Sequence, residues 1–160
     1  MSEAPALRPY LPADTPVLAA IFAAAIGELT GDDYTEEQQE AWMAVAEDEE
    51  FGRRLAADLT LIATMQDSPV GFASLRGKDH IRMLYVHPSV ARQGVASMLV
   101  DALEKLAGGR GAEKLTVDAS DSAADFFRKR GYVAKQRNSI TVNGEWLANT
   151  TMQKTLGGKP

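Results

Sequence analysis

The chain has 160 residues, the length of one ordinary domain, and its 45% apolar and 24% charged residues are typical of globular proteins. It contains no cysteine, which excludes disulfide scaffolds, cysteine-ligated metal sites and thiol nucleophiles. Its net charge of −5 argues against nonspecific binding to nucleic acid.

The expected elements begin with a short edge strand over residues 7–10. A helix should follow, with Asp14 as its N-cap and apolar residues at helical spacing as far as Leu29. Thr35 and Gln38 have the pattern of a capping box, which predicts a second helix that carries Trp42.

In the middle of the chain the apolar period changes from that of a helix to that of a strand. Strands are expected over residues 59–65, 70–75 and 80–87, and a helix over 94–107. A strand over 114–119 and a short helix over 121–130 come next. Asn143-Gly144 predicts a type I′ turn within a hairpin over 140–147.

This order of elements predicts an α/β fold with a mixed central sheet of about seven strands and helices on both faces. Residues 1–156 should form a single domain and residues 157–160 a flexible tail. The helix over 94–107 should act as a crossover that makes the strands before and after it parallel.

The N-terminal residues carry no secretion signal, and the apolar run from Val17 to Ile26 is ten residues long, too short to cross a bilayer. No spacing of histidines and acids fits a metal site. We therefore expect a cytoplasmic protein, monomeric or homodimeric, without a metal, a membrane or a nucleic acid among its partners.

One segment has the features of a phosphate site. The strand that ends before Pro88 is followed by a polar loop over 89–96 that leads directly into a helix. The first N–H groups of a helix are unpaired and positively polarised, while Gly94 and Ala96 let an anion approach the backbone. Arg92 adds a full positive charge. A tight helix entry with a purely structural role explains the same spacing equally well.

The charges are distributed unevenly. Residues 9–52 contain eleven acids and no lysine or arginine, whereas residues 92–137 contain nine bases and six acids. This asymmetry is consistent with a cationic partner on the acidic side and an anionic one on the basic side. The alternative is that the acids form the solvated faces of two helices.

The segment Arg92–Ala96, placed after Val86-His87-Pro88, resembles the acyl-CoA loop of the GNAT superfamily of N-acetyltransferases, whose pattern is Gln/Arg-x-x-Gly-x-Gly/Ala. Residues 117–132 are similar to the superfamily's next strand and helix, and the likeness spans nearly the whole chain. It implies a GNAT-like fold with acetyl-CoA as cosubstrate.

By position, the resemblance implies that the backbone of residues 84–86 pairs with the pantetheine arm and that the amides of residues 92–97 hold the pyrophosphate. Side chains from the following strand and helix would contact the rest of the cofactor. The implied cofactor-binding set is Leu84, Tyr85, Val86, Arg92, Gln93, Gly94, Val95, Ala96, Ser97, Ser120, Phe126, Phe127 and Arg130.

Two departures from the family pattern affect the expected chemistry. Ala91 occupies the usual Gln/Arg position, which implies weaker binding of CoA because one side-chain contact is missing. Phe127 stands where a tyrosine commonly protonates the departing thiolate. Ser120, where many members carry an asparagine, is also the expected N-cap of the helix over 121–130.

The implied function is transfer of an acetyl group from acetyl-CoA to a primary amine of a small molecule or peptide, by direct attack. Tyr85 and Glu28 are the candidate catalytic residues, while Glu28, Asp33 and Tyr34 are the candidate contacts for a cationic acceptor. For Glu28, Tyr85 and Tyr34, a structural role is the favoured alternative. The alternative function is a non-catalytic module that binds acyl-CoA or another protein on the same fold.

Overall fold

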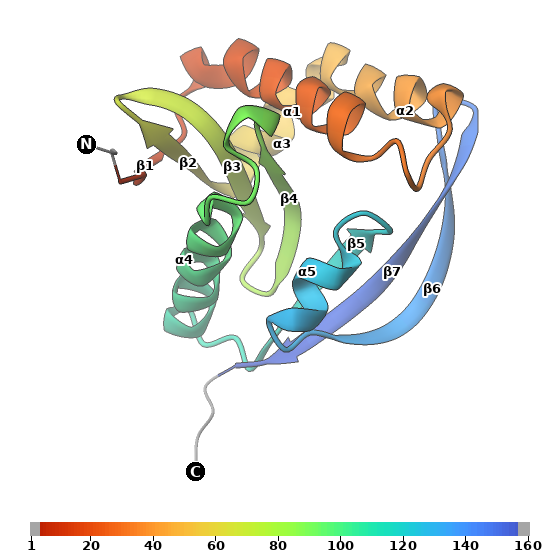
Figure 1. The fold of residues 1–160 in the computed structure, drawn as a ribbon. Coiled ribbons are helices and arrows are strands. Elements are labelled where there is room, and N and C mark those ends of the chain that lie inside the picture. The colour runs from red at the N-terminus through yellow and green to blue at the C-terminus, as the bar shows by residue number, and fades with distance from the viewer. Residues whose placement is uncertain (1–3, 157–160) are drawn as a thin grey trace.

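The computed structural model describes residues 4–156, so the expected tail at 157–160 lies outside the described residues. One mixed sheet of seven strands, in the order β1-β2-β3-β4-β5-β7-β6, forms the centre of the molecule. Helices cover both of its faces (Figure 1). The predicted α/β fold is confirmed, including the mixed sheet and the helices on both faces.

The elements follow the expected order with one addition. The first half of the described chain contains β1 (Ala6–Pro9), α1 (Thr15–Leu29), α2 (Glu36–Met43), α3 (Glu49–Ala57), β2 (Leu59–Met65), β3 (Ser68–Arg76) and β4 (His80–Val86). The second half contains α4 (Val95–Gly109), β5 (Lys114–Ser120), α5 (Ala124–Lys129), β6 (Val133–Val142) and β7 (Glu145–Thr155).

Several boundaries follow from local chemistry. The capping box that starts α2 is formed: the Thr35 hydroxyl accepts from the amide of Gln38 at 3.1 Å, and the Gln38 side chain accepts from the amide of Thr35 at 2.8 Å. At the tip of the β6–β7 hairpin, Asn143 and Gly144 both have positive φ, as a type I′ turn requires. Asp14 precedes α1, but its carboxylate pairs with Arg8 instead of capping the helix.

Helix α3 was not predicted, because Gly52 and a run of charges obscure its short apolar stripe. The structure places Asp48 at its N-cap, where the carboxylate accepts from the amide of Glu50 at 2.8 Å. Phe51 and Leu55 lie four residues apart on one side of the helix and are buried against the sheet.

The helix expected over 121–130 is shorter than predicted. Helix α5 begins at Ala124, because residues 121–123 form a turn in which the Ser120 hydroxyl accepts from the amide of Ala123 at 3.2 Å. Ser120 therefore caps this turn and not the helix, which corrects the predicted N-cap. Helix α4 begins at Val95 and ends at Gly109, so the expected crossover is present.

The sheet splits between β4 and β5. These strands are parallel and pair only at His80 with Thr116 and at Ile81 with Val117. Beyond these pairs they diverge, although β3 follows β4 as far as Val86 and β7 follows β5 as far as Ser120 (Figure 1). The facing edges of β4 and β5 are consequently unpaired over the last residues of both strands.

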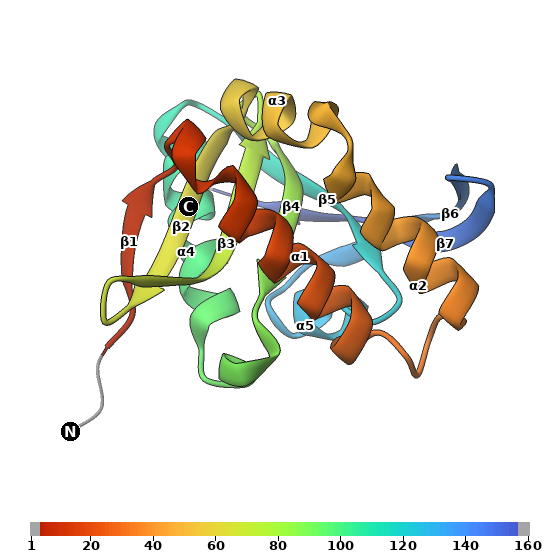
Figure 2. The same ribbon diagram turned by 90° about the horizontal axis from the view of Figure 1, so that it is seen from above.

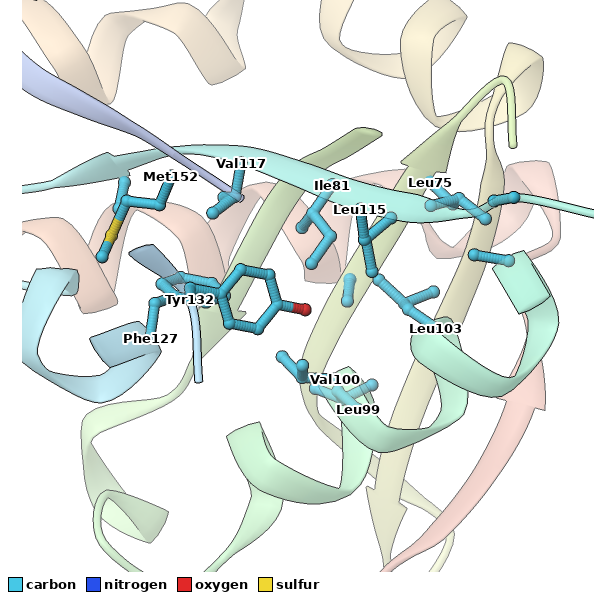
Figure 3. Packing of buried hydrophobic residues seen from close by; sticks show 14 of the residues in the cluster. Leu75, Ile81, Leu99, Val100, Leu103, Leu115, Val117, Phe127, Tyr132 and Met152 are labelled. Atoms are coloured by element: carbon cyan, nitrogen blue, oxygen red, sulfur yellow. The ribbon is translucent and has the colours of Figure 1, made fainter. Parts of the chain in front are cut away.

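Two hydrophobic cores hold the layers together. One lies between the sheet and helices α4 and α5, and Figure 3 shows the ring of Tyr132 there between Phe127 and the side chains of α4. The other lies between the sheet and helices α1 and α3, and Figure 2 shows α1 and α2 running across that face. The gap between β4 and β5 thus connects two separately packed faces.

The segment Pro12–Leu29 is long and apolar enough to cross a membrane by length and composition alone. In this fold its buried residues are those that pack on the sheet, namely Leu18, Ile21, Phe22, Ala25 and Ile26. The unbroken apolar run from Val17 to Ile26 is the central part of this longer segment, which adds residues 12–16 before it and 27–29 after it.

Candidate functional site

The N-terminus of α4 presents a cluster of unpaired backbone amides. Among the described residues, the N–H groups of Gly94, Val95, Ala96 and Ser97 have no backbone acceptor, and the first hydrogen bond of the helix runs from Met98 to the carbonyl of Gly94 at 3.0 Å. No side chain caps this helix. The free amides and the helix dipole together form an anion-binding site.

The loop before α4 is shaped by residues with left-handed backbone conformations. Gly94 has φ +85° and Arg92 has φ +64°. A Cβ at Gly94 would meet no atom within 4 Å, so the space beside its backbone is open. Arg92, Gln93 and Gly94 are exposed, whereas the side chain of Val95 is buried in the core. Val95 can therefore contribute to this site only through its amide.

The unpaired edge of β4 lies next to this loop in the chain. Leu84 and Val86 pack on the core under α4, while Tyr85 points to the opposite core under α1. The backbone of residues 84–86 pairs with β3 on one side and has no strand partner on the other. An extended molecule can add to this edge as a further strand does.

Of the predicted cofactor-binding residues on β5 and around α5, some line the gap and others do not. Ser120 and Phe127 line the gap, whereas Phe126 is partly buried and packs edge-to-face on Phe127 with ring centres 5.2 Å apart. Arg130 forms an ion pair with Asp101 of α4 and lies 5.7 Å above the ring of Phe126. Its guanidinium is thus already engaged within the protein.

A cavity of about 360 Å³ extends through the gap between β4 and β5. Its lining includes Phe127 from the α5 face and Phe22 from the α1 face, so it reaches both sides of the sheet. Its aromatic lining residues are Phe22, Tyr34, Trp42, Phe51, Tyr85 and Phe127, and its charged or titratable polar ones are Arg54, Arg76, His80, Arg82 and Asp118.

Tyr85 projects its ring into the aromatic wall of this cavity, 4.6 Å from the ring of Phe22. Burial raises the pKa of Tyr85 to about 12, and the neighbouring Trp42 side chain opposes part of that rise. Near neutral pH Tyr85 is therefore a proton donor and not a base.

Tyr34 is buried in the same wall, and its hydroxyl both donates and accepts a hydrogen bond. It donates to the carbonyl of Ala148 at 2.6 Å and accepts from the amide of Asp121 at 2.9 Å. Burial raises the pKa of Tyr34. The residue ties the loop after α1 to the ends of β5 and β7, which gives it a positioning role in the cavity wall.

Two predicted site residues lie outside the cavity. Glu28 is exposed near the end of α1, and Asp33 is exposed with its carboxylate accepting from the Ser122 hydroxyl at 2.8 Å. Neither of them lines the cavity, and nor does any other acid of residues 9–52. The cavity lining therefore gives no support to Glu28 as a catalytic residue, to Glu28 and Asp33 as acceptor contacts, or to a cationic acceptor.

Sequence reasoning missed the charged end of the cavity. Arg54, Arg76 and Arg82 come from α3, β3 and β4, and His80, at the start of β4, is partly buried. Burial, followed by the charge of Arg76, lowers the pKa of His80, which keeps its ring neutral near pH 7. Pairing of β3 with β4 across the short turn at 77–79 could have placed Arg76 opposite His80, but the sequence analysis did not identify α3 or its contribution.

Comparisons with known proteins agree with this geometry. A model of the acetyltransferase (GNAT) domain matches residues 30–156. The uncharacterized N-acetyltransferase YafP of Escherichia coli K12 is 34% identical over 147 residues, 92% of this chain and 93% of its own length.

Solved structures agree as well. A GCN5-related N-acetyltransferase from Rhodopseudomonas palustris is 66% identical, with a TM-score of 0.95 and 98% of each chain covered. The PaiA N-acetyltransferase of Thermoplasma acidophilum, solved in complex with coenzyme A, has a TM-score of 0.79 at 17% identity, covering 95% of this chain and 99% of its own, which is a likeness of fold.

Proposed function

The chain belongs to the GNAT acetyltransferase family and is an acetyl-CoA-dependent N-acetyltransferase, and from that premise we propose that it acetylates a primary amine of a small molecule or peptide by direct attack on the thioester. The observation that carries this proposal is the continuity of three features. Free amides at the start of α4, the unpaired edge of β4 and a cavity through the sheet follow one another along the same gap.

The residues present fit the cosubstrate. The amides of Gly94 to Ser97 match a pyrophosphate because they are unpaired and lie at a helix N-terminus, where no Cβ fills the space beside Gly94. The open edge of β4 matches an extended arm carrying amide groups. When bound, acetyl-CoA supplies the activated acetyl group. Leu84, Tyr85 and Val86 would then hold it at the gap, while Ser120 and Phe127 would border it on the other side.

Catalysis in this arrangement comes mainly from positioning. Holding an amine and a thioester in contact replaces a bimolecular encounter, which is worth about 7–11 kcal/mol in well-oriented systems. Tyr85 keeps its proton and can donate it to the departing thiolate, because its pKa is far above neutral. His80 and Asp118 line the same cavity and can accept the proton that the amine loses.

The test is release of the CoA thiol from acetyl-CoA in the presence of a panel of primary amines, with the product identified by mass spectrometry. Direct attack predicts thiol release only when an amine is present, and no acetylated protein when acetyl-CoA is supplied alone. The Tyr85→Phe variant should lower kcat while leaving the affinity for acetyl-CoA unchanged. Tight binding of acetyl-CoA without release for any amine would instead support a non-catalytic module.

A further inference from the structure

The end of the cavity next to α3 is lined by arginines, and we infer that it binds a carboxylate, so that the acceptor is an amine that also carries a carboxylate group. This inference rests on the proposed function, because it names the acceptor class for that same site. Arg54 comes from the last turn of α3, Arg76 ends β3, and Arg82 lies on β4. All three face the side of the sheet that the cofactor cradle does not occupy.

Arg82 is fixed in the wall at this end of the cavity by a register shift in the sheet and by an ion pair. The register between β3 and β4 shifts after the pair Ser74 and Met83, so Arg82 is an extra residue on β4. Its guanidinium binds the carboxylate of Asp58 through two hydrogen bonds, at 2.7 and 3.2 Å. The Asp58 side chain is only 2% exposed. Arg82 is therefore a fixed, neutralised part of the wall, which leaves ligand binding to its neighbours.

The guanidinium groups of Arg76 and Arg54 are available to bind a ligand. Among residues 4–156, Arg76 forms no ion pair or side-chain hydrogen bond. Arg54 has an exposed pair with Glu50 of the same helix at 3.7 Å, of a kind that contributes little. A guanidinium presents parallel N–H donors that match the two oxygens of a carboxylate.

The local charge balance supports an anion here and not a cation. Because Asp58 neutralises Arg82, the charges left in the lining are those of Arg76 and Arg54 against one acid, Asp118, although the whole chain carries −5. The charges of Arg76 and Arg82 also contribute to lowering the pKa of His80, after the larger effect of burial, so their field reaches across this part of the cavity. Asp118, which accepts from the Thr151 hydroxyl at 2.6 Å, leaves one negative partner for the amine end of the same molecule.

The decisive experiment compares matched acceptors. Amino acids with a terminal amine and two to six carbons are assayed with acetyl-CoA beside their primary amides, which keep the amine and lose the carboxylate. We expect wild-type kcat/KM to be higher for the acid than for the amide by about tenfold or more, since a charge-assisted hydrogen bond contributes about 1.5–3 kcal/mol. Arg76→Gln should remove most of that preference by lowering kcat/KM for the acid alone.

Two further variants complete the design. Arg54→Gln should also reduce the preference for the acid, and Lys78→Gln should leave it unchanged because Lys78 lies in the turn after Arg76 but outside the cavity. The affinity of every variant for CoA is measured as a check on folding, since its cradle is on the other face.

Absence of acetyl transfer to any amine would overturn the proposed function itself. Transfer with equal rates for acids and amides, or a preference that survives both arginine substitutions, would overturn only the carboxylate site. Loss of the preference in both arginine variants with CoA affinity retained supports it.

Discussion

Gly94 is the residue on which the cofactor site depends most directly. Its φ of +85° lies in the left-handed region that glycine adopts without strain, and it turns the chain so that the next three amides point outward from α4. Any side chain introduced there brings backbone strain of about 1–2 kcal/mol as well as its own chemistry. A variant that tests the anion site must therefore separate charge from strain.

Gly94→Glu and Gly94→Gln make that separation, because the two side chains have the same size and the same cost in backbone strain. We expect Gly94→Glu to bind acetyl-CoA at least about tenfold more weakly than Gly94→Gln, since like charges 4 Å apart repel by about 1–4 kcal/mol at the effective dielectric constants of a protein surface. Isothermal titration calorimetry measures the difference, and added salt should shrink it. Equal affinities would contradict the assignment of a pyrophosphate to this loop.

Phe127 is the residue at which the sequence departs from the family pattern with a chemical consequence. It lines the cavity, is only 2% exposed, and packs edge-to-face on Tyr132 with ring centres 5.1 Å apart. A thiolate is a tolerable leaving group near its own pKa, about 8.5 for a simple thiol, so the reaction proceeds without a donor at this position.

Phe127→Tyr should raise kcat by up to about tenfold, which corresponds to about 1.4 kcal/mol of activation free energy. The new hydroxyl would stand at the edge of the gap, where it can protonate the departing thiolate. Phe126→Tyr is the matched control, because Phe126 is its neighbour but does not line the cavity. Steady-state kinetics with the affinity for acetyl-CoA measured in parallel would show an unchanged kcat if position 127 serves only in packing.

At the scale of elements, the loop after α1 and helix α2 are fastened to the β6–β7 hairpin. The Gln38 side chain donates to the carbonyl of Trp146 at 2.7 Å, and the Asn143 side chain donates to the carbonyl of Ala41 at 2.8 Å. Tyr34 adds its two hydrogen bonds beneath them. These contacts hold one wall of the cavity against strands that are far away in the sequence.

Tyr34→Phe removes the hydroxyl that bonds to Ala148 and Asp121, and it leaves the partly buried carbonyl of Ala148 and amide of Asp121 without that partner. We expect the free energy of unfolding to fall by about 1–3 kcal/mol, the usual cost of an unsatisfied buried polar group. Urea denaturation measures this loss. Tyr10→Phe, which removes a hydrogen bond to Thr15 at 2.7 Å in a less buried place, should cost less. A larger loss of unfolding free energy from Tyr10→Phe than from Tyr34→Phe would contradict the role of Tyr34 in stabilising the cavity wall.

For the molecule as a whole, the shifted pKa values define a range of pH with maximal stability. His80 has a lowered pKa, so below about pH 6.5 the unfolded chain binds its proton more readily and stability falls as pH falls. Tyr34, Tyr85 and Tyr132 have raised pKa values, so stability is lost as pH rises above about 10. Asp14, whose pKa Arg8 lowers, adds a further loss below about pH 4.

The expected result is a plateau of unfolding free energy between about pH 6.5 and 10, measured by urea denaturation at a series of pH values. His80→Gln should flatten the decline just below pH 6.5 without changing the alkaline side. A decline in that range that persists in His80→Gln would assign it to other groups.

The sequence alone was sufficient for features that depend on a few neighbouring residues. The free amides after Gly94, the capping box at Thr35 and the turn at Asn143-Gly144 arise from contacts within four residues, so local chemistry determines them. The order of elements, together with the crossover helix, was likewise enough for the mixed sheet, whereas the family resemblance depended on the residues of the loop Arg92–Ala96 and of the segment 117–132.

Only the tertiary structure decided which charges meet. Eleven acids between residues 9 and 52 dominate the sequence, yet none lines the cavity, because helix faces and loops turn them to other surfaces. The charged lining depends on an extra residue in β4 that places Arg82, and on helix α3, whose apolar stripe is too short to recognise. Register and packing act between residues far apart in the chain, so they determine the acceptor side of the site, while local backbone chemistry determines the cofactor side.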